Sequence, residues 1–409
     1  MKQKTALISG AGIAGPAAAY WLNAAGWQVT IVEHAGAPRD GGYVIDFWGL
    51  GYDLAERMGL LNEIERVGYH ARELRVIGDR GERLAGFGTK VFDELTGGRY
   101  VTLARRDLSR LLLAKAAPVA EMIFGDEIVM LQHDPAGVTA RLRSGPVRRF
   151  DLVVGADGLH SQVRRLAFGP HEQFEKPLGY AVAAFEARHY QRRDPDIYMM
   201  HTKPGRMVGR FTLRDDRSLF LFVFTYDGAR PATLEQQKTL LASLYRADGW
   251  EIADILQRLD EVQELYFDHV SQVVAPTWSS GRSVLVGDAA FCPSLLAGQG
   301  SALAIVAAYV LAGELARAEG HIEEAFAAYE RRLRPYIATK QAGAARFASA
   351  FAPRTAFGVW FRNLVIQSFA IPGLAKLAVG REMIDRLRLP DYRLGPMPST
   401  MERRTSDPG

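Results

Sequence analysis

The chain has 409 residues, of which 48% are hydrophobic and 23% charged, so it can bury one large core or two smaller ones. Its formal net charge of +4 is spread along the sequence without a Lys/Arg-rich block, which argues against nucleic acid as a partner and suits anionic small molecules. The single cysteine, Cys292, excludes an intrachain disulfide, and the N-terminus reads as a strand rather than a signal peptide, so we expect a cytoplasmic protein.

Three regions that are far apart in the chain read as pieces of one α/β fold. Residues 5–33 predict a strand, a Gly-rich turn, a helix and a second strand. Residues 150–165 and 283–316 each predict a buried strand that runs into a turn, the latter followed by a long Ala/Leu helix. Between them, residues 178–224 alternate apolar and polar side chains, which predicts antiparallel sheet. One domain is therefore expected to be interrupted by another.

The remaining segments are predicted to be mainly helical. Residues 236–258 predict one helix. Residues 331–381 contain no Asp or Glu and nine Lys or Arg, and we expect short helices packed over the antiparallel sheet with their basic residues in solvent. An amphipathic surface for a membrane or a partner is the alternative, which Pro353 and Pro372 disfavour because they divide the stretch. The uncharged residues 289–313 are broken by Pro and Gly and should not span a bilayer.

The first motif with clear chemistry is the turn Gly10-Ala11-Gly12-Ile13-Ala14-Gly15 after the first strand. Gly10 permits a tight turn, Gly12 lets the backbone approach a pyrophosphate, and Gly15 lets the helix pack closely on the strand. The helix N-terminus offers N–H groups to phosphate. Glu33 ends the second strand, 18 residues after Gly15, and can accept hydrogen bonds from an adenosine ribose. The unit predicts a dinucleotide site without distinguishing NAD from FAD, and an ordinary Gly-rich turn is the alternative.

Two further motifs end buried strands. Residues 151–158 finish in Ala156-Asp157-Gly158, and residues 283–290 contain Gly287-Asp288 and lead into Gly298-Gln299-Gly300. An Asp at a strand end can hold a ribityl hydroxyl, and a helix that opens at Gly300 offers N–H groups to the flavin O2 edge or to a pyrophosphate. The three motifs in this order favour FAD.

With these motifs the chain resembles the class A flavoprotein aromatic hydroxylases, which include para-hydroxybenzoate hydroxylase and the tetracycline-inactivating monooxygenases, over residues 1 to about 340. The resemblance implies an α/β fold, in which a GxGxxG Rossmann-like FAD-binding domain is interrupted by a mixed or antiparallel-sheet substrate domain and followed by C-terminal helices. The expected division is 1–75, 100–170 and 275–340 for the FAD-binding domain, 76–99 and 171–274 for the substrate domain, 341–395 for C-terminal helices, and 396–409 for a flexible tail.

The resemblance also implies roles for individual residues. Arg105 should contact FAD, Asp157 should be tied to both FAD and NAD(P)H, and Asp288 should bind the ribityl chain. Arg39 should lie near NADPH, and Asp46 near the flavin ring. The full set of implied cofactor-binding residues is Gly10, Gly12, Ala14, Gly15, Glu33, His34, Arg39, Asp46, Arg105, Asp157, Gly287, Asp288, Gly298, Gln299, Gly300 and Ser301.

Some positions depart from the family pattern. His34 stands where the family usually has Arg after the ribose acid, and Leu295 stands where Pro is common. Ala302, Val306 and Ala307 replace polar residues that often follow the Gly-Gln-Gly, and we interpret that helix as a packing element. These departures bear on the position and reactivity of the flavin more than on its binding.

The activity implied by the resemblance is monooxygenation. FAD would be reduced by NAD(P)H and would react with O2 to a flavin C4a-hydroperoxide that hydroxylates an aromatic or polyketide-like small molecule. The sequence has no second GxGxxG and no metal-ligand cluster of closely spaced His and Cys, so we expect no metal, a transient nicotinamide site and a monomer or homodimer. The alternatives are a flavin oxidase, epoxidase or reductase on the same fold, or a flavin-binding protein without turnover.

The substrate pocket is expected between the flavin and the sheet of residues 178–224. Because side chains of a strand alternate between two faces, about half of any set of sheet residues should face elsewhere. The candidate lining residues are Tyr198, Met207, Arg210 and Phe222. The sequence does not identify a catalytic base.

Overall fold

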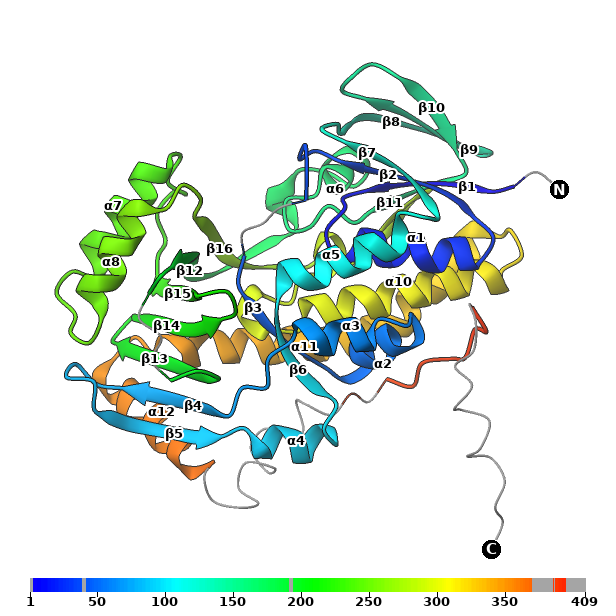
Figure 1. The fold of residues 1–409 in the computed structure, drawn as a ribbon. Coiled ribbons are helices and arrows are strands. Elements are labelled where there is room, and N and C mark those ends of the chain that lie inside the picture. The colour runs from blue at the N-terminus through cyan, green and yellow to red at the C-terminus, as the bar shows by residue number, and fades with distance from the viewer. Residues whose placement is uncertain (1–2, 39–41, 191–193, 370–384, 386, 395–409) are drawn as a thin grey trace, which may run out of the picture.

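The computed structural model describes residues 3–38, 42–190, 194–369, 385 and 387–394. Figure 1 shows two large sheets, with helices between and beneath them. The chain enters the first sheet, crosses to the second and returns, crosses and returns once more, and the last described helices are α11 (Ile322–Phe351) and α12 (Ala356–Ser368). The predicted α/β fold with an interrupting sheet is confirmed. Arg39, Pro372 and the predicted tail lie outside the described residues.

The first sheet is parallel apart from one short edge strand. The neighbours β18, β11, β1, β2 and β7 all pair in parallel, and β17 pairs antiparallel with β18. Apolar side chains fill these strands because both faces are covered, as in other parallel sheets. The strand order is β17 (Ser279–Ser280), β18 (Ser283–Leu285), β11 (Leu152–Gly155), β1 (Thr5–Ser9), β2 (Gln28–Glu33), β7 (Ala120–Phe124).

Helices and two small sheets surround this parallel sheet. Helix α10 meets the length and composition of a membrane span, but 78% of its apolar window is buried inside the fold, as in a core helix. The helices are α1 (Ala14–Ala24), α2 (Gly49–Arg57), α3 (Leu61–Val67), α5 (Arg105–Ala116), α6 (Gln162–Ala167), α9 (Asp288–Phe291) and α10 (Gly300–Arg317). The small sheets pair β3 (Val44–Trp48) with β6 (Tyr100–Ala104), and β8 (Ile128–Asp134) with β9 (Gly137–Leu142) and β10 (Val147–Phe150).

The second sheet is antiparallel except where β13 and β4 run in parallel. Strand β4 joins it although it comes from an earlier part of the chain, which makes the sheet mixed. The order is β16 (Tyr266–Val273), β12 (Glu175–Arg188), β15 (Arg217–Thr225), β14 (Arg206–Leu213), β13 (Ile197–Lys203), β4 (Glu73–Ile77), β5 (Arg83–Gly88). The short elements α4 (Lys90–Thr96), η1 (His171–Gln173) and η2 (Leu295–Ala297) complete the described fold.

The two faces of the second sheet bury different partners. On the outer face, Phe222 and its neighbours pack against α7 (Leu234–Tyr245) and α8 (Ile252–Glu261), which Figure 1 shows in green. On the inner face, Met207 and Val223 pack with Leu296 of η2, which belongs to the first domain. This inner face is therefore the one that can face a cofactor.

The single helix predicted for residues 236–258 is wrong, because the structure has two helices there. Thr233 and Gln236 form a capping box that starts α7. The chain then turns at Gly249-Trp250, where Trp250 takes a positive φ of 57°, before α8 begins. The apolar residues on either side of the turn have the spacing of a single helical face, so the sequence pattern predicts one continuous helix.

The basic C-terminal stretch also differs from its prediction. Helix α11 runs unbroken through Pro335, and its Leu333 and Ile337 lie in the core of the first domain. The expected set of short helices is thus wrong for α11. Helix α12 follows Pro353 and packs on β5 and β13 of the second sheet, as predicted.

Candidate cofactor and substrate site

The sequence motifs converge because their strands are neighbours. Strands β18, β11, β1 and β2 lie side by side in parallel, so their carboxyl ends meet at one edge of the sheet. That edge carries the Gly-rich turn after β1, Asp157 after β11, Asp288 after β18 and Glu33 at the end of β2. Open α/β sheets bind ligands at the carboxyl ends of their strands.

Close backbone contacts explain the spacing of the glycines. A Cβ on Gly15 would lie 1.8 Å from the carbonyl oxygen of Gly10, so only glycine lets α1 approach the turn. At Gly12, by contrast, a Cβ would meet only a guanidinium nitrogen of Arg105, at 3.9 Å. The turn is thus packed tightly at one end and open at the position where a phosphate would pass.

Glu33 holds this turn from the adjacent strand. Its Oε2 accepts a hydrogen bond of 2.8 Å from the N–H of Ala11, and its Oε1 accepts one of 3.0 Å from the N–H of Ala35. The His34 Nδ1 lies 3.0 Å from the same Oε1. The carboxylate is therefore oriented beside the turn, where remaining lone pairs could accept from a ribose.

A half-buried cation and a half-buried carboxylate lie further along this edge. Arg105 begins α5, and its guanidinium points toward Gly12. Burial opposes its charge, but nearby Tyr43, Asp288 and Tyr266 together raise the pKa of Arg105. Burial raises the pKa of Asp288, and Arg105 partly offsets that rise. The pair places a positive charge near the turn and a carboxylate acceptor beyond it.

Two helix N-termini flank these charges. A Cβ on Gly287 would lie 3.2 Å from the Cβ of Ala14 in α1 and 3.3 Å from that of Ala304 in α10, so this glycine lets both helices approach. A Cβ on Gly300 would lie 3.3 Å from the Asp288 Oδ1. A guanidinium, two positive helix ends and a carboxylate fit the pyrophosphate and ribityl hydroxyls of FAD.

The carboxylate of Asp157 accepts its hydrogen bonds from neighbouring groups of the protein. Its carboxylate accepts hydrogen bonds from the hydroxyls of Ser9 and Ser161 and from the N–H groups of Gln162 and Val163. It thereby fixes the end of β1 to the start of α6. The role implied by the family resemblance stays a prediction, and the visible contacts are those of a residue that positions the surrounding turns.

Arg164, a residue without a predicted role, joins two of the motifs. It is fully buried, and its guanidinium donates to the carbonyl oxygens of Leu159 and Ala289, at 2.6 and 2.8 Å. The Asp-Gly turn and the Gly-Asp turn are thereby tied together. The one feature of the sequence that could have pointed to Arg164 is its place three residues after Ser161, at the start of the helix that follows the Asp-Gly turn.

Asp46 lies at the boundary between the two domains. Its carboxylate accepts hydrogen bonds from the hydroxyls of Tyr100 and Thr102, both at 2.7 Å, and of Tyr198 at 3.0 Å. Burial and the Asp46 charge raise the pKa of Tyr198 well above its usual value, so its hydroxyl stays protonated and donates. Asp46 also lines a small hollow together with Gln299. Residues of β3, β6, β13 and the Gly-Gln-Gly turn thus meet, although sequence reasoning had not singled out Tyr100 and Thr102.

The candidate pocket residues divide between the two faces of the second sheet. Tyr198 packs with Tyr43 and Val44 of the first domain, and Met207 packs with Leu296, so both lie on the inner face. The expectation that Arg210 and Phe222 line the pocket is wrong. Strand alternation turns them outward, where Arg210 pairs with Glu251 and Phe222 packs on Tyr245.

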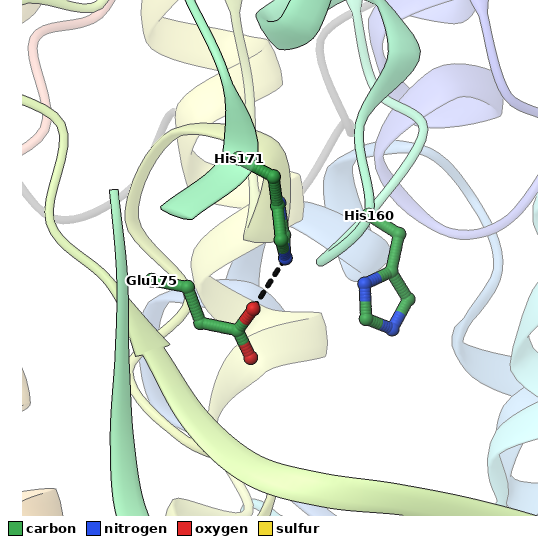
Figure 2. Close-up of side chains that lie close together, drawn as sticks. All are labelled: His160, His171 and Glu175. Carbon is green, nitrogen blue, oxygen red and sulfur yellow. Dashed lines mark ion pairs between the residues drawn. The ribbon is translucent and has the colours of Figure 1, made fainter. Parts of the chain in front are cut away.

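Three potential metal ligands also come together, just after the Asp-Gly turn and α6. His160, His171 and Glu175 have ligand atoms within 4.8 Å of one another, and Figure 2 shows His171 directed toward Glu175 with His160 to one side. The Arg164 guanidinium lies 2.5 Å from the His171 Nδ1. Because arginine can only donate, the ring proton is on Nε2 and faces Glu175. A metal on Nε2 would force that proton toward a buried cation, so we assign this cluster to holding the turn after α6.

Comparisons with known proteins agree with this geometry. The FAD binding domain family matches residues 3–340. This chain belongs to that family, and it is a class A flavin monooxygenase. A flavin-dependent monooxygenase from an unknown prokaryotic organism is 33% identical over 368 residues, covering 87% of this chain and 89% of the relative. An uncharacterised protein of Mycobacterium tuberculosis is 37% identical over 349 residues, covering 83% and 92%.

Solved structures show the same fold for the monooxygenase. The crystal structure of the tetracycline destructase Tet(51) superimposes with a TM-score of 0.81 at 28% identity, covering 95% of this chain and 100% of that chain. FAD is thus the cofactor of this monooxygenase, and NAD(P)H is the reductant typical of its class. Its departures at His34 and Leu295 have not removed the FAD-binding fold.

Asp288→Ala is expected to weaken FAD retention with little loss of the fold. If Asp288 binds a ribityl hydroxyl as the sequence predicts, loss of that bond should cost about 1–3 kcal/mol, or roughly 5- to 150-fold in the dissociation constant of FAD. Flavin occupancy after extensive dialysis measures the effect, and the melting temperature of the apoprotein is the control. Full flavin occupancy in the variant would show that Asp288 does not hold the cofactor.

Proposed function

We propose that the monooxygenase hydroxylates an aromatic or polyketide-like small molecule, with NAD(P)H as reductant and O2 as oxygen donor. The observation that carries the proposal is the meeting of the flavin motifs with the inner face of the second sheet at Asp46 and Tyr198. The similarity to Tet(51) and to flavin-dependent monooxygenases supports it.

The proposed cofactor contacts follow from the motif edge. Gly12, Arg105 and the N-termini of α1 and α10 would hold the pyrophosphate, Glu33 the ribose and Asp288 the ribityl chain. Residues 298–301 would lie against the isoalloxazine. Bound FAD supplies hydride acceptance from NAD(P)H and the activation of O2.

The residues of the chain would bind and orient the substrate beside the flavin. The inner face of the second sheet, with Met207 and Tyr198, would hold the substrate ring and exclude water. Asp46 orients the Tyr198 hydroxyl at one side of this space. Arg39 is proposed to lie near the nicotinamide. The domain boundaries given above, a cytoplasmic location and a monomer or homodimer are likewise part of the proposal.

Two measurements test the proposed reaction. An aromatic substrate should accelerate anaerobic flavin reduction by NAD(P)H in stopped-flow experiments, since reduction without substrate would waste the reductant as peroxide. Turnover under 18O2 should then place one heavy oxygen atom in the product. Substrate that is consumed without incorporating label would eliminate hydroxylation and leave an oxidase or a reductase. Stable flavin without any NAD(P)H oxidation would indicate a binding protein.

A further inference from the structure

A cation from the C-terminal helix α12 is buried against the second sheet. Arg362 is only 9% exposed. Its Nη1 lies 3.2 Å from the Sδ of Met200 on β13. The helix lies along the β13, β4 and β5 side of the sheet, where its Ile366 packs with Val76, Ala85 and Phe87. A guanidinium is thus held in a largely apolar setting.

Within the described part of the chain, this cation has no carboxylate partner. Its Nε and Nη2 donate to the amide oxygen of the adjacent Asn363, at 3.1 and 2.9 Å. Burial lowers the pKa of Arg362 to about 10, so the group stays charged at neutral pH. The sequence supplies no acid nearby along the chain, since residues 331–381 contain no Asp or Glu. An unpaired buried charge is costly, and proteins normally pair such groups.

The guanidinium borders the space assigned to the substrate. Met200 belongs to the same cluster as Met207 and Leu296, on the inner face of the sheet. Parallel pairing of β13 with β4 sets Met200 opposite Val76, and these two residues point to the same side. Helix α12, which packs on Val76, therefore lies on the face that looks toward the flavin motifs. Arg362 therefore lies beside the inner face that the proposed function assigns to the substrate.

We propose that Arg362 binds an anionic oxygen group of the substrate, a carboxylate or phenolate attached to the aromatic system. This deepens the proposed function and rests on it, because the anion would be held while the ring lies against the flavin. A planar guanidinium can donate two parallel hydrogen bonds to a carboxylate, and such bonds are roughly twice as strong as neutral ones. The ligand would thereby supply a negative charge that the described residues do not place beside Arg362.

The experiment compares matched acids and amides on the FAD-loaded protein. Isothermal titration calorimetry would use benzoate and benzamide, salicylate and salicylamide, and anthranilate and anthranilamide. We expect the wild type to prefer the acid in at least one pair by about tenfold or more, as a charge-assisted hydrogen bond allows. Arg362→Met should abolish this preference while leaving affinity for the amide within about twofold. Arg331→Met, which removes an exposed charge from the same acid-free stretch, should change neither the acid preference nor the affinity for the amide.

Stability gives a second readout. Because an unpaired buried cation opposes folding, Arg362→Met should melt at the wild-type temperature or above it, whereas a structural ion pair would make it melt lower. Arg362→Lys keeps the charge and should retain part of the acid preference. This variant provides the test if Arg362→Met does not fold. An acid preference that survives in Arg362→Met, or a wild type that binds no acid better than its amide, would overturn the inference.

The binding assay and the oxygen-labelling assay separate the two proposals. Acid binding that depends on Arg362, without label in any product, would leave the anion site standing and remove the hydroxylase. Label in the product of a neutral substrate, without any preference for acids over amides, would support the hydroxylase and remove the anion site.

Discussion

Gly15→Ala is expected to give protein that is devoid of flavin and severely destabilised. The added Cβ would lie 1.8 Å from the Gly10 carbonyl oxygen and 3.4 Å from the Ile8 side chain, and the first of these contacts is with backbone that cannot rotate away. Overpacking of this kind costs about 3 kcal/mol or more, because α1 must move off the sheet. Chemical denaturation of the apoprotein and the flavin content of the purified protein measure the two effects.

Gly12→Ala is the matched control for this substitution. The same methyl group at Gly12 would enter open space, with only Arg105 at 3.9 Å, so the apoprotein should unfold at nearly the wild-type denaturant concentration. FAD should nevertheless be lost, since the methyl group fills the approach of the pyrophosphate. Equal stability loss in the two variants would show that the contacts in this turn do not differ as the structure indicates.

The fold was predictable where local signals and topology agree. The Gly-rich turn, the Asp-Gly turn and the Gly-Asp turn each follow a short apolar strand, and parallel pairing brings such strand ends to one edge. Spacing alone could therefore predict a dinucleotide edge that involves Asp157 and Asp288. The distinction between their roles was not predictable, because it depends on which donors surround each carboxylate.

Tertiary contacts decided what the sequence left open. Alternation predicts that half of the sheet residues face the pocket, but the choice between Met207 and Arg210 depends on which face α7 and α8 cover. The partners of Asp46 come from strands up to 152 residues away in the chain. Arg362 carries no motif at all, and only its burial beside Met200 distinguishes it from the other basic residues of its stretch.

Asp157→Ala should destabilise the apoprotein by about 3 kcal/mol or more, since several buried donors would lose their acceptor at once. Two of these donors are the N–H groups of Gln162 and Val163, at 2.9 and 3.1 Å, which begin α6. The hydroxyls of Ser9 and Ser161 are the others. Loss of the carboxylate therefore frees both the end of β1 and the start of a helix. Urea unfolding of the flavin-free protein measures the change.

Comparison with Asp288→Ala separates a structural carboxylate from one that holds a ligand. Both aspartates are half-buried, and the loss of hydration raises the pKa of each. Asp157 has four donors from the protein, whereas the side chains that act on the pKa of Asp288 are those of Arg105, by its charge, and Cys292, by a hydrogen bond. Asp157→Ala should thus lower apoprotein stability much more than Asp288→Ala, and Asp288→Ala should lower FAD affinity at nearly constant stability. If the two variants show the same ratio of stability loss to FAD loss, the division of roles along this edge is wrong.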